Sequence, residues 1–329
     1  MTVAAPTIEA FFVERLSSQR QASPRTITAY RDTWRLLLGY VHARTGKLPA
    51  QLDIADLDAG TIAAFLAHLE QERGNSVNTR NARLAAIRSL FRYASLRHPE
   101  HADLIRRVLA IPAKRHDRTD INYLNTGEID ALLAAPDRHT WLGRRDYALI
   151  LLAIQTGLRV SELTALTAAD LQLARPAQVN CVGKGRKHRA TPLTTDTVAV
   201  LRVWLQEQKP APTDPLFSSR NGGRLSTDAV QWLLTKHATA ASTACRTLAA
   251  KTISPHVLRH TCAMNLLHAG IDTSVIALWL GHFSVQTTQI YIHADLTLKE
   301  RALARTAPPN TNPGRYRPPD VLLAFLEAL

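Results

Sequence analysis

The chain has 329 residues, with 40 Lys and Arg against 27 Asp and Glu, a formal charge of +13 and a hydrophobic fraction of 46%. At roughly 100–200 residues per domain this length predicts two domains, and the composition excludes a disordered chain. The positive charge favours a polyanionic partner, nucleic acid first, although a functionally neutral basic surface has the same composition.

Cysteine use and hydropathy narrow the class of protein further. Cys181, Cys245 and Cys262 are odd in number and widely spaced, which supports neither a disulfide framework nor a cysteine-rich zinc site. The most apolar run, residues 148–154, is far shorter than the ~20 residues that a membrane span needs, so it is predicted to be a buried helix. The N-terminus lacks the basic leader and apolar core of a signal peptide. We expect a bacterial protein of the cytoplasm, associated with the nucleoid.

The N-terminal part, residues 1–112, is predicted to be a helical domain. Apolar residues recur there at helical spacing without any strand-like run, and Ser23 before Pro24 is typical of a first helical turn. One helix carries two stripes. Its apolar stripe is Leu84, Ile87 and Phe91, and its polar stripe, at i, i+7 and i+11, is Asn81, Arg88 and Arg92. That polar stripe either contacts DNA or is an ordinary solvated face.

Residues 113–122 are predicted to link two domains, because the surrounding sequence IPAKRHDRTDIN is basic, contains a proline and has almost no apolar residues. Residues 123–305 then form a second, mostly helical domain. Within it AQVNCVGKGRKHRATPL alternates apolar and polar residues around a Gly-Lys-Gly turn and predicts a β-hairpin. Residues 306–329 are a proline-rich tether and a short amphipathic helix, which docks on its own domain or on a neighbouring protomer. The fold class is therefore mainly α with a small β-hairpin.

The stretch SPHVLRHTCAMNLLHAG, residues 254–270, carries the first candidate site. His256 and His260 are four residues apart, a spacing that suits two metal ligands on one helix face. A zinc hydrolase of the H-E-x-x-H kind needs a carboxylate between them, and the stretch contains none. Arg259 occupies this interval instead, and a guanidinium with imidazoles is suited to holding phosphate oxygens.

Three further segments supply what phosphodiester chemistry needs. Arg159 follows Gly157, a plausible helix stop, so its side chain is either aimed into a cleft or is a surface arginine at a turn. Lys184 lies at the tip of the hairpin, in a turn that is not a nucleotide-binding P-loop. His282 follows a glycine turn, and Tyr291 comes on the next helical stretch.

In this order and at these intervals, the set resembles the tyrosine recombinases of the phage integrase and Xer type. The resemblance covers nearly the whole chain, with less specific motifs in the N-terminal half, which is similar to that family's core-binding domain. It implies a C-shaped clamp around duplex DNA at inverted-repeat-like sites, and a synaptic homotetramer. The catalytic residues it implies are Arg159, Lys184, His256, Arg259, His282 and Tyr291.

The resemblance also implies a role for each residue. Tyr291 attacks the scissile phosphate and holds one strand as a 3′-phosphotyrosine, without ATP, metal or other cofactor. The two arginines clamp the non-bridging oxygens. Lys184 protonates the departing 5′-oxygen, His256 helps move the tyrosine proton, and His282 bonds a phosphate oxygen.

Other residues near these motifs have weaker signals. Glu162, one turn after Arg159, either orients that guanidinium, which we favour, or is a solvated helix residue. His260 and His268 are interpreted as structural, and His293 is left open.

Three alternatives remain beside the recombinase. A type IB topoisomerase shares the nucleophile and the clamp but acts alone. A DNA-binding regulator has no need for an aligned tyrosine, and a zinc-dependent nuclease needs metal and leaves no covalent adduct. The target sequence, the biological setting and cleavage in cis or in trans are not indicated by these motifs.

Overall fold

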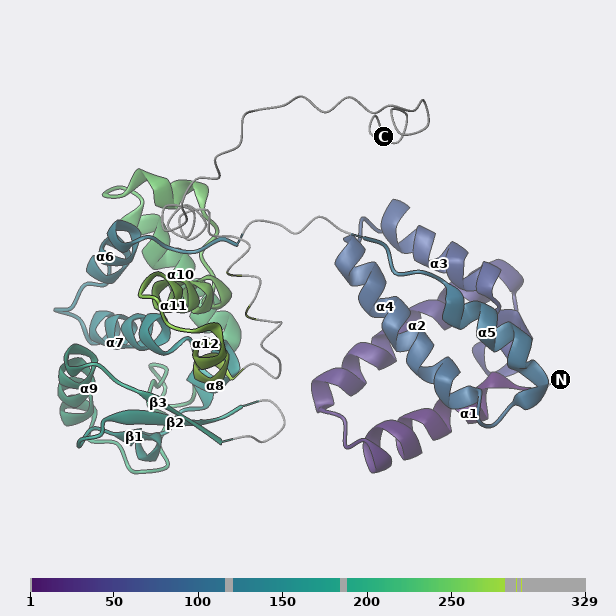
Figure 1. The fold of residues 1–329 in the computed structure, drawn as a ribbon, viewed down its shortest axis with the longest axis horizontal. Helices are drawn as coiled ribbons and strands as arrows, with labels where there is room; N and C mark the ends of the chain where they lie inside the picture. The colour runs from purple at the N-terminus through teal and green to yellow at the C-terminus, as the bar shows by residue number, and fades with distance from the viewer. Residues whose placement is uncertain (1, 116–120, 184–187, 282–287, 289–290, 292–329) are drawn as a thin grey trace, which may run out of the picture. The chain divides into compact units, whose positions relative to one another are not determined.

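The computed structural model describes residues 2–115, 121–183, 188–281, 288 and 291. The chain divides into two compact units, Met1–Thr119 and Asp120–Leu329 (Figure 1). Each unit has its own hydrophobic core. The predicted fold class is confirmed, because among the described residues helices dominate both units and a small sheet lies in the second. In the described ranges no helix is both long and apolar enough to cross a membrane.

The N-terminal unit is built from helices. α1 continues directly into a π-helical segment, and short 3₁₀ turns precede α3 and α5. The helices are α1 (Ala4–Ala10), the π-helical segment (Phe11–Gln19), α2 (Pro24–Thr45), α3 (Ala59–Gln71), α4 (Val77–Ala94) and α5 (Ala102–Ala110), and the 3₁₀ turns are Pro49–Gln51, Ile54–Leu57 and Pro99–His101.

Helix ends in this unit follow local chemistry. Ser23 caps α2 by accepting a hydrogen bond from the backbone N–H of Thr26, and Pro24 fills the first helical position, as predicted. The same helix stops at Gly46, whose φ of 70° lies in the left-handed region. The apolar stripe of α4 is buried, with Ile87 and Phe91 at most 1% exposed. The side chains of this apolar stripe therefore form part of the core of the N-terminal unit.

The C-terminal unit surrounds a central helix, α7, with other helices and a sheet. The elements are α6 (Thr126–Ala134), α7 (Trp141–Thr156), α8 (Val160–Ala165), β1 (Leu171–Gln172), β2 (Gln178–Val182), β3 (His188–Pro192), α9 (Thr195–Gln208), α10 (Thr227–Ala241), α11 (Pro255–His268) and α12 (Thr273–Leu280), with 3₁₀ turns at Ala168–Asp170 and Arg246–Ala250.

α7 contains the long apolar run of residues 148–154 and packs between α9 and α11 (Figure 1). Ala148, Leu149, Ile150 and Leu152 are at most 1% exposed. A helix that is apolar on most sides must be covered on most sides. The apolar run in residues 148–154 is therefore a buried helix, as the sequence predicts.

The predicted hairpin is confirmed as β2 and β3, and β1 adds a third antiparallel strand beside β2. Cys181 pairs with Arg189, and Val179 pairs with Thr191. Val179, Cys181 and Thr191 are buried. Because side chains on alternate residues share one face, Arg189 lies on the inner face of the sheet.

Candidate active site

Arg159 begins the helix that follows the central helix of the C-terminal unit. α7 ends at Gly157, whose φ is 62°, and Arg159 is the N-cap of α8. A Cβ on Gly157 would lie 2.6 Å from Leu280 Cδ2, so close packing and left-handed backbone both require glycine. The guanidinium donates to the Gly281 carbonyl oxygen at 3.1 Å, and the Arg159 side chain is 32% exposed. The predicted helix stop therefore places Arg159 beside the C-terminal end of α12.

Glu162 orients Arg159, as favoured from the sequence. Its carboxylate accepts hydrogen bonds from the Arg159 backbone N–H at 2.9 Å and from Arg159 Nη1 at 2.8 Å. Burial raises the pKa of Glu162, but the bond from the Arg159 backbone and the charges of Arg189 and Arg159 outweigh it, so the pKa is lowered. Glu162 is therefore ionised and fixed in place.

Arg259 approaches the same place from α11. Only 3% of the residue is exposed, and Nη1 and Nη2 donate to the carbonyl oxygens of Gly157 and Leu280, each at 2.6 Å. Burial and the charge of Arg159 lower its pKa to about 10. It still carries a proton at neutral pH, which keeps a buried positive charge at the junction of α7, α11 and α12.

Arg189 is a third arginine of this cluster, and the sequence motifs do not indicate it. From β3 it donates to the Leu280 carbonyl oxygen at 2.7 Å and to Glu162 at 3.0 Å. The hairpin alternation is the signal that could have found it, because Arg189 is opposite the apolar Cys181 in a predicted strand pair.

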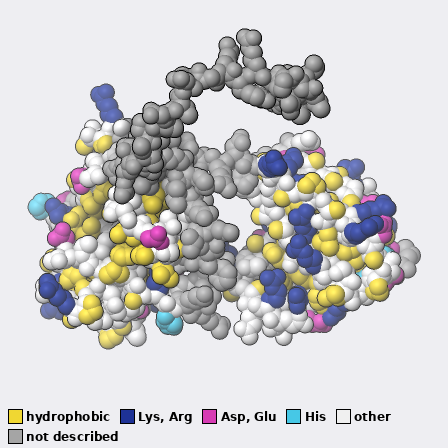
Figure 2. All heavy atoms as spheres, viewed as in Figure 1, with side chains coloured by type: hydrophobic (Ala, Val, Ile, Leu, Met, Phe, Trp, Pro, Cys, Tyr) yellow, Lys and Arg dark blue, Asp and Glu magenta, His cyan; other side chains and the backbone are white. Residues whose placement is uncertain are grey.

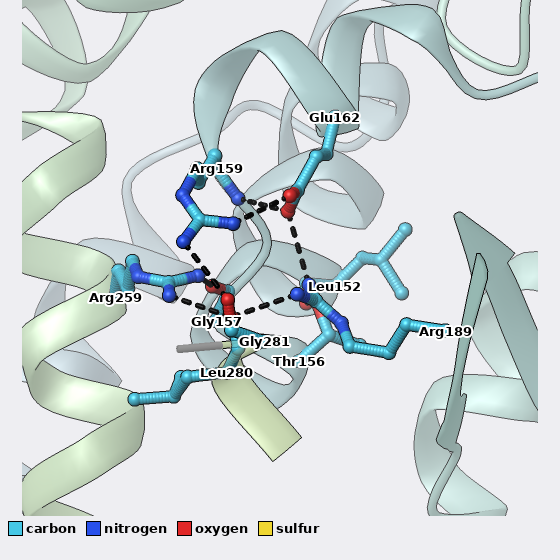
Figure 3. Close-up of polar contacts among 9 residues, drawn as sticks. All are labelled: Leu152, Thr156, Gly157, Arg159, Glu162, Arg189, Arg259, Leu280 and Gly281. Carbon is cyan, nitrogen blue, oxygen red and sulfur yellow. Dashed lines mark hydrogen bonds and ion pairs between the residues drawn. The ribbon is translucent and has the colours of Figure 1, made fainter. Parts of the chain in front are cut away.

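These side chains meet around one turn of backbone, residues 280–281 (Figure 3). Gly281 has a φ of 64°, and a Cβ there would lie 2.2 Å from Arg189 Nη1. In this cluster three guanidinium groups face one carboxylate, Glu162. The excess positive charge and the partly exposed Arg159 suit the cluster to binding a phosphate.

The two histidines of α11 and Tyr291 form a second group. The rings of His256 and His260 are 4.8 Å apart, and Nδ1 of His260 lies 3.0 Å from Oη of Tyr291. Tyr291 has helical backbone and is 1% exposed. Burial is the main reason that the pKa of Tyr291 rises to about 12, although the charge of Arg259 opposes it.

Burial and nearby cations also act on the histidines. Burial, then His256 and Arg259, lower the pKa of His260 to about 4, and the pKa of His256 is lowered by desolvation, Arg259 and Arg159. His260, interpreted from the sequence as structural, is thus the histidine that contacts the Tyr291 hydroxyl. His268 packs its ring against Tyr123.

Several predicted positions are outside the described residues. These are Lys184, His282, His293 and the tether and helix of residues 306–329. Their predicted roles stay predictions.

The polar stripe of α4 makes contacts within its own unit. The Asn81 side chain donates to the Lys114 carbonyl oxygen at 2.8 Å and accepts from its backbone N–H at 3.0 Å. Arg88 donates to the carbonyl oxygen of Ile111. Arg92 is exposed. Asn81 and Arg88 therefore hold the segment after α5 against α4, and Arg92 is the member of the stripe open to a ligand.

Comparison with known families gives the class of protein. Residues 122–297 match the phage integrase family, and residues 9–98 match the N-terminal SAM-like domain of phage integrases. The chain belongs to the phage integrase family of tyrosine recombinases. It is 53% identical over 325 residues to the integrase/recombinase y4rC of Sinorhizobium fredii, a match that covers 99% of this chain and 98% of that protein.

Other members of the family are more distant. The tyrosine recombinase XerC of Xanthomonas campestris pv. campestris is 34% identical over 284 residues, which cover 86% of this chain and 83% of XerC. These matches favour a recombinase over the topoisomerase and the regulator considered above.

Two solved structures share the fold of this recombinase. XerH bound to a difH DNA substrate after cleavage has a TM-score of 0.69 at 24% identity, over 87% of this chain and 81% of XerH. The Tn1549 transposon integrase with circular intermediate DNA has a TM-score of 0.69 at 18% identity, over 93% of this chain and 100% of that integrase.

Proposed function

We propose that this recombinase cleaves and rejoins DNA through a covalent 3′-phosphotyrosine formed by Tyr291. The observation that carries the proposal is the convergence of Arg159, Arg189 and Arg259 beside an α11 histidine that contacts the tyrosine hydroxyl. Two of the arginines, Arg159 and Arg259, are those expected to hold the scissile phosphate. Their charges stabilise the phosphorane-like transition state, a role that a metal ion has in other phosphoryl-transfer enzymes.

The proposed reaction conserves the energy of the phosphodiester. The Tyr291 oxygen attacks phosphorus, the bond from phosphorus to the 5′-oxygen breaks, and Lys184 gives that oxygen a proton. Rejoining reverses these steps with a 5′-hydroxyl of the same or another duplex. His256 and His282 keep the roles that the family resemblance implies.

The proposed substrate is duplex DNA with inverted-repeat-like sites. The charge of +13 supports a polyanionic partner, and Lys and Arg side chains are spread over the visible face of the N-terminal unit (Figure 2). We further propose a homotetramer on DNA, with residues 306–329 docking on a neighbouring protomer. The relatives crystallised with DNA support this choice of partner.

The first experiment tests whether the covalent protein–DNA intermediate forms. Wild-type protein and Tyr291→Phe are incubated in EDTA with nicked duplexes tiled across the DNA that flanks the protein's own gene. The nick releases the small cleaved fragment and traps the adduct. We expect an SDS-resistant protein–DNA adduct with the wild type alone. Tight DNA binding without any adduct would instead support a regulator, and cleavage that EDTA abolishes would support a metal-dependent nuclease.

A further inference from the structure

We propose that His260 is the group that directly accepts the proton of Tyr291 during strand cleavage, and that His256, whose ring centroid lies 4.8 Å from that of His260, acts on this proton only through His260. This inference rests on the proposed function. The described structure places His260 Nδ1 3.0 Å from Tyr291 Oη, with the two rings edge-on and their centroids 5.5 Å apart. A general base must lie within hydrogen-bond reach of the proton that it removes, and His260 meets this requirement.

Burial explains why the proton acceptor must belong to the protein. Tyr291 is 1% exposed and packs among apolar residues of α11 and α12, including Met264, Ile276 and Leu280. Bulk water therefore has no access to the hydroxyl in this conformation. A phenol is a poor nucleophile until its proton leaves, so the hydroxyl needs a neighbouring base.

The protonation states assign the direction of the hydrogen bond. The pKa of His260 is about 4 and that of Tyr291 is about 12, so both groups are neutral at pH 7. Between a neutral phenol and a neutral imidazole, the phenol is the stronger acid. Tyr291 Oη therefore donates, and Nδ1 of His260 accepts, with the imidazole hydrogen on Nε2.

The position of Arg259 connects this pair to the phosphate. Arg259 precedes His260 on α11, and its charge lowers the pKa of both His260 and Tyr291. As the new bond to phosphorus forms, the phenol oxygen becomes far more acidic, and its proton passes to Nδ1. A phosphate anion bound by Arg259 also favours the imidazolium that results. On rejoining, the imidazolium returns this proton to the tyrosine oxygen as the bond to phosphorus breaks.

His260→Asn tests the proposal because Asn keeps an acceptor oxygen near the position of Nδ1 but cannot take up the proton. Its matched control is His268→Asn, at the end of the same helix against Tyr123. The assay is the single-turnover rate of adduct formation between pH 6 and pH 9, on the nicked duplex that gives the wild-type adduct. Circular dichroism and DNA affinity check that each variant is folded.

The expected result is a change in pH dependence as well as in rate. His260→Asn should react about 10²–10⁴-fold more slowly at pH 7, the usual effect of losing a general base. Its rate should rise about tenfold per pH unit, since the nucleophile is then the rare phenolate. In the wild type and in His268→Asn, proton transfer to a neutral base should give no such slope.

Two chemical replacements, one in the protein and one in the DNA, distinguish a defect in activating the nucleophile from a defect in protonating the leaving group. Replacing Tyr291 with a fluorinated tyrosine of lower pKa should restore much of the rate of His260→Asn. A duplex with a sulfur in place of the bridging 5′-oxygen needs no proton on the leaving group, so it should rescue Lys184→Ala but not His260→Asn.

Each outcome decides one proposal. A wild-type rate and pH profile in His260→Asn overturns the role of His260, as does a slow variant with an unchanged profile and no rescue by fluorotyrosine. Failure of the wild type to form any Tyr291-dependent adduct overturns the proposed function itself.

Discussion

Glu162→Gln tests whether one buried carboxylate holds the arginine cluster together. The side chain of Glu162 is 4% exposed and that of Arg189 is 9% exposed, and they are 3.0 Å apart. Removing one partner of such a buried pair leaves the other charge uncompensated, at a cost of about 3–5 kcal/mol. The bond to Arg159 adds little, because that side chain is 32% exposed and screened by solvent. We therefore expect the unfolding free energy to fall by about 3 kcal/mol, since Gln keeps one acceptor.

The matched control is Glu128→Gln. Glu128 also sits at the third position of a helix, accepts from its N-cap backbone and is buried, but its cation, Lys251, is 29% exposed. We expect its loss to cost only about 1–2 kcal/mol. Urea unfolding followed by tryptophan fluorescence reports mainly on the C-terminal unit, which contains both glutamates, because four of the five tryptophans lie beyond residue 120.

Activity separates the two variants further. Under conditions where both are folded, Glu162→Gln should slow adduct formation about 10²-fold through a misplaced Arg159, and Glu128→Gln should not. Equal losses of stability in the two variants would show that Glu162 does not neutralise a buried arginine, and would refute the reasoning.

Three other predictions concern backbone strain, DNA binding and protonation. Gly281→Ala should destabilise the protein more than Gly270→Ala in thermal unfolding, because both need left-handed backbone but only the first Cβ meets a side chain. Arg92→Ala should reduce the slope of log affinity against log salt by about 1, whereas Arg88→Ala, whose guanidinium is bound within its own unit, should leave the slope unchanged. His260 should titrate near pH 4 by NMR, below the unfolded value, so unfolding free energy should fall by at most about 3 kcal/mol as pH drops from 6.5 to 4. A midpoint near 6.5 would show that this imidazole is solvated.

Chemistry that acts within a few residues could be predicted from the sequence. The cap at Ser23 and the stop at Gly157 depend on one side chain or one backbone angle each, so both appear at the expected residues. The apolar run of α7 and the alternation of β2 and β3 also determine burial directly. The order of Arg159, Lys184, the HVLRH of residues 256–260, His282 and Tyr291 indicated the family, because the five motifs together supply the residue types that phosphodiester chemistry needs.

Contacts between distant residues could only be seen in the tertiary structure. Helical spacing puts His256 and His260 on one face of α11, but the packing of Tyr291 against that helix decides which of them meets the hydroxyl. In the same way the stripe of Asn81 and Arg88 was visible in the sequence, whereas the segment after α5 that these side chains hold is 23 or more residues away. The sequence by itself thus determined the elements, the family and most candidate residues. Tertiary structure decided which side chains touch, because a hydrogen bond depends on the distance between atoms that the chain order leaves free.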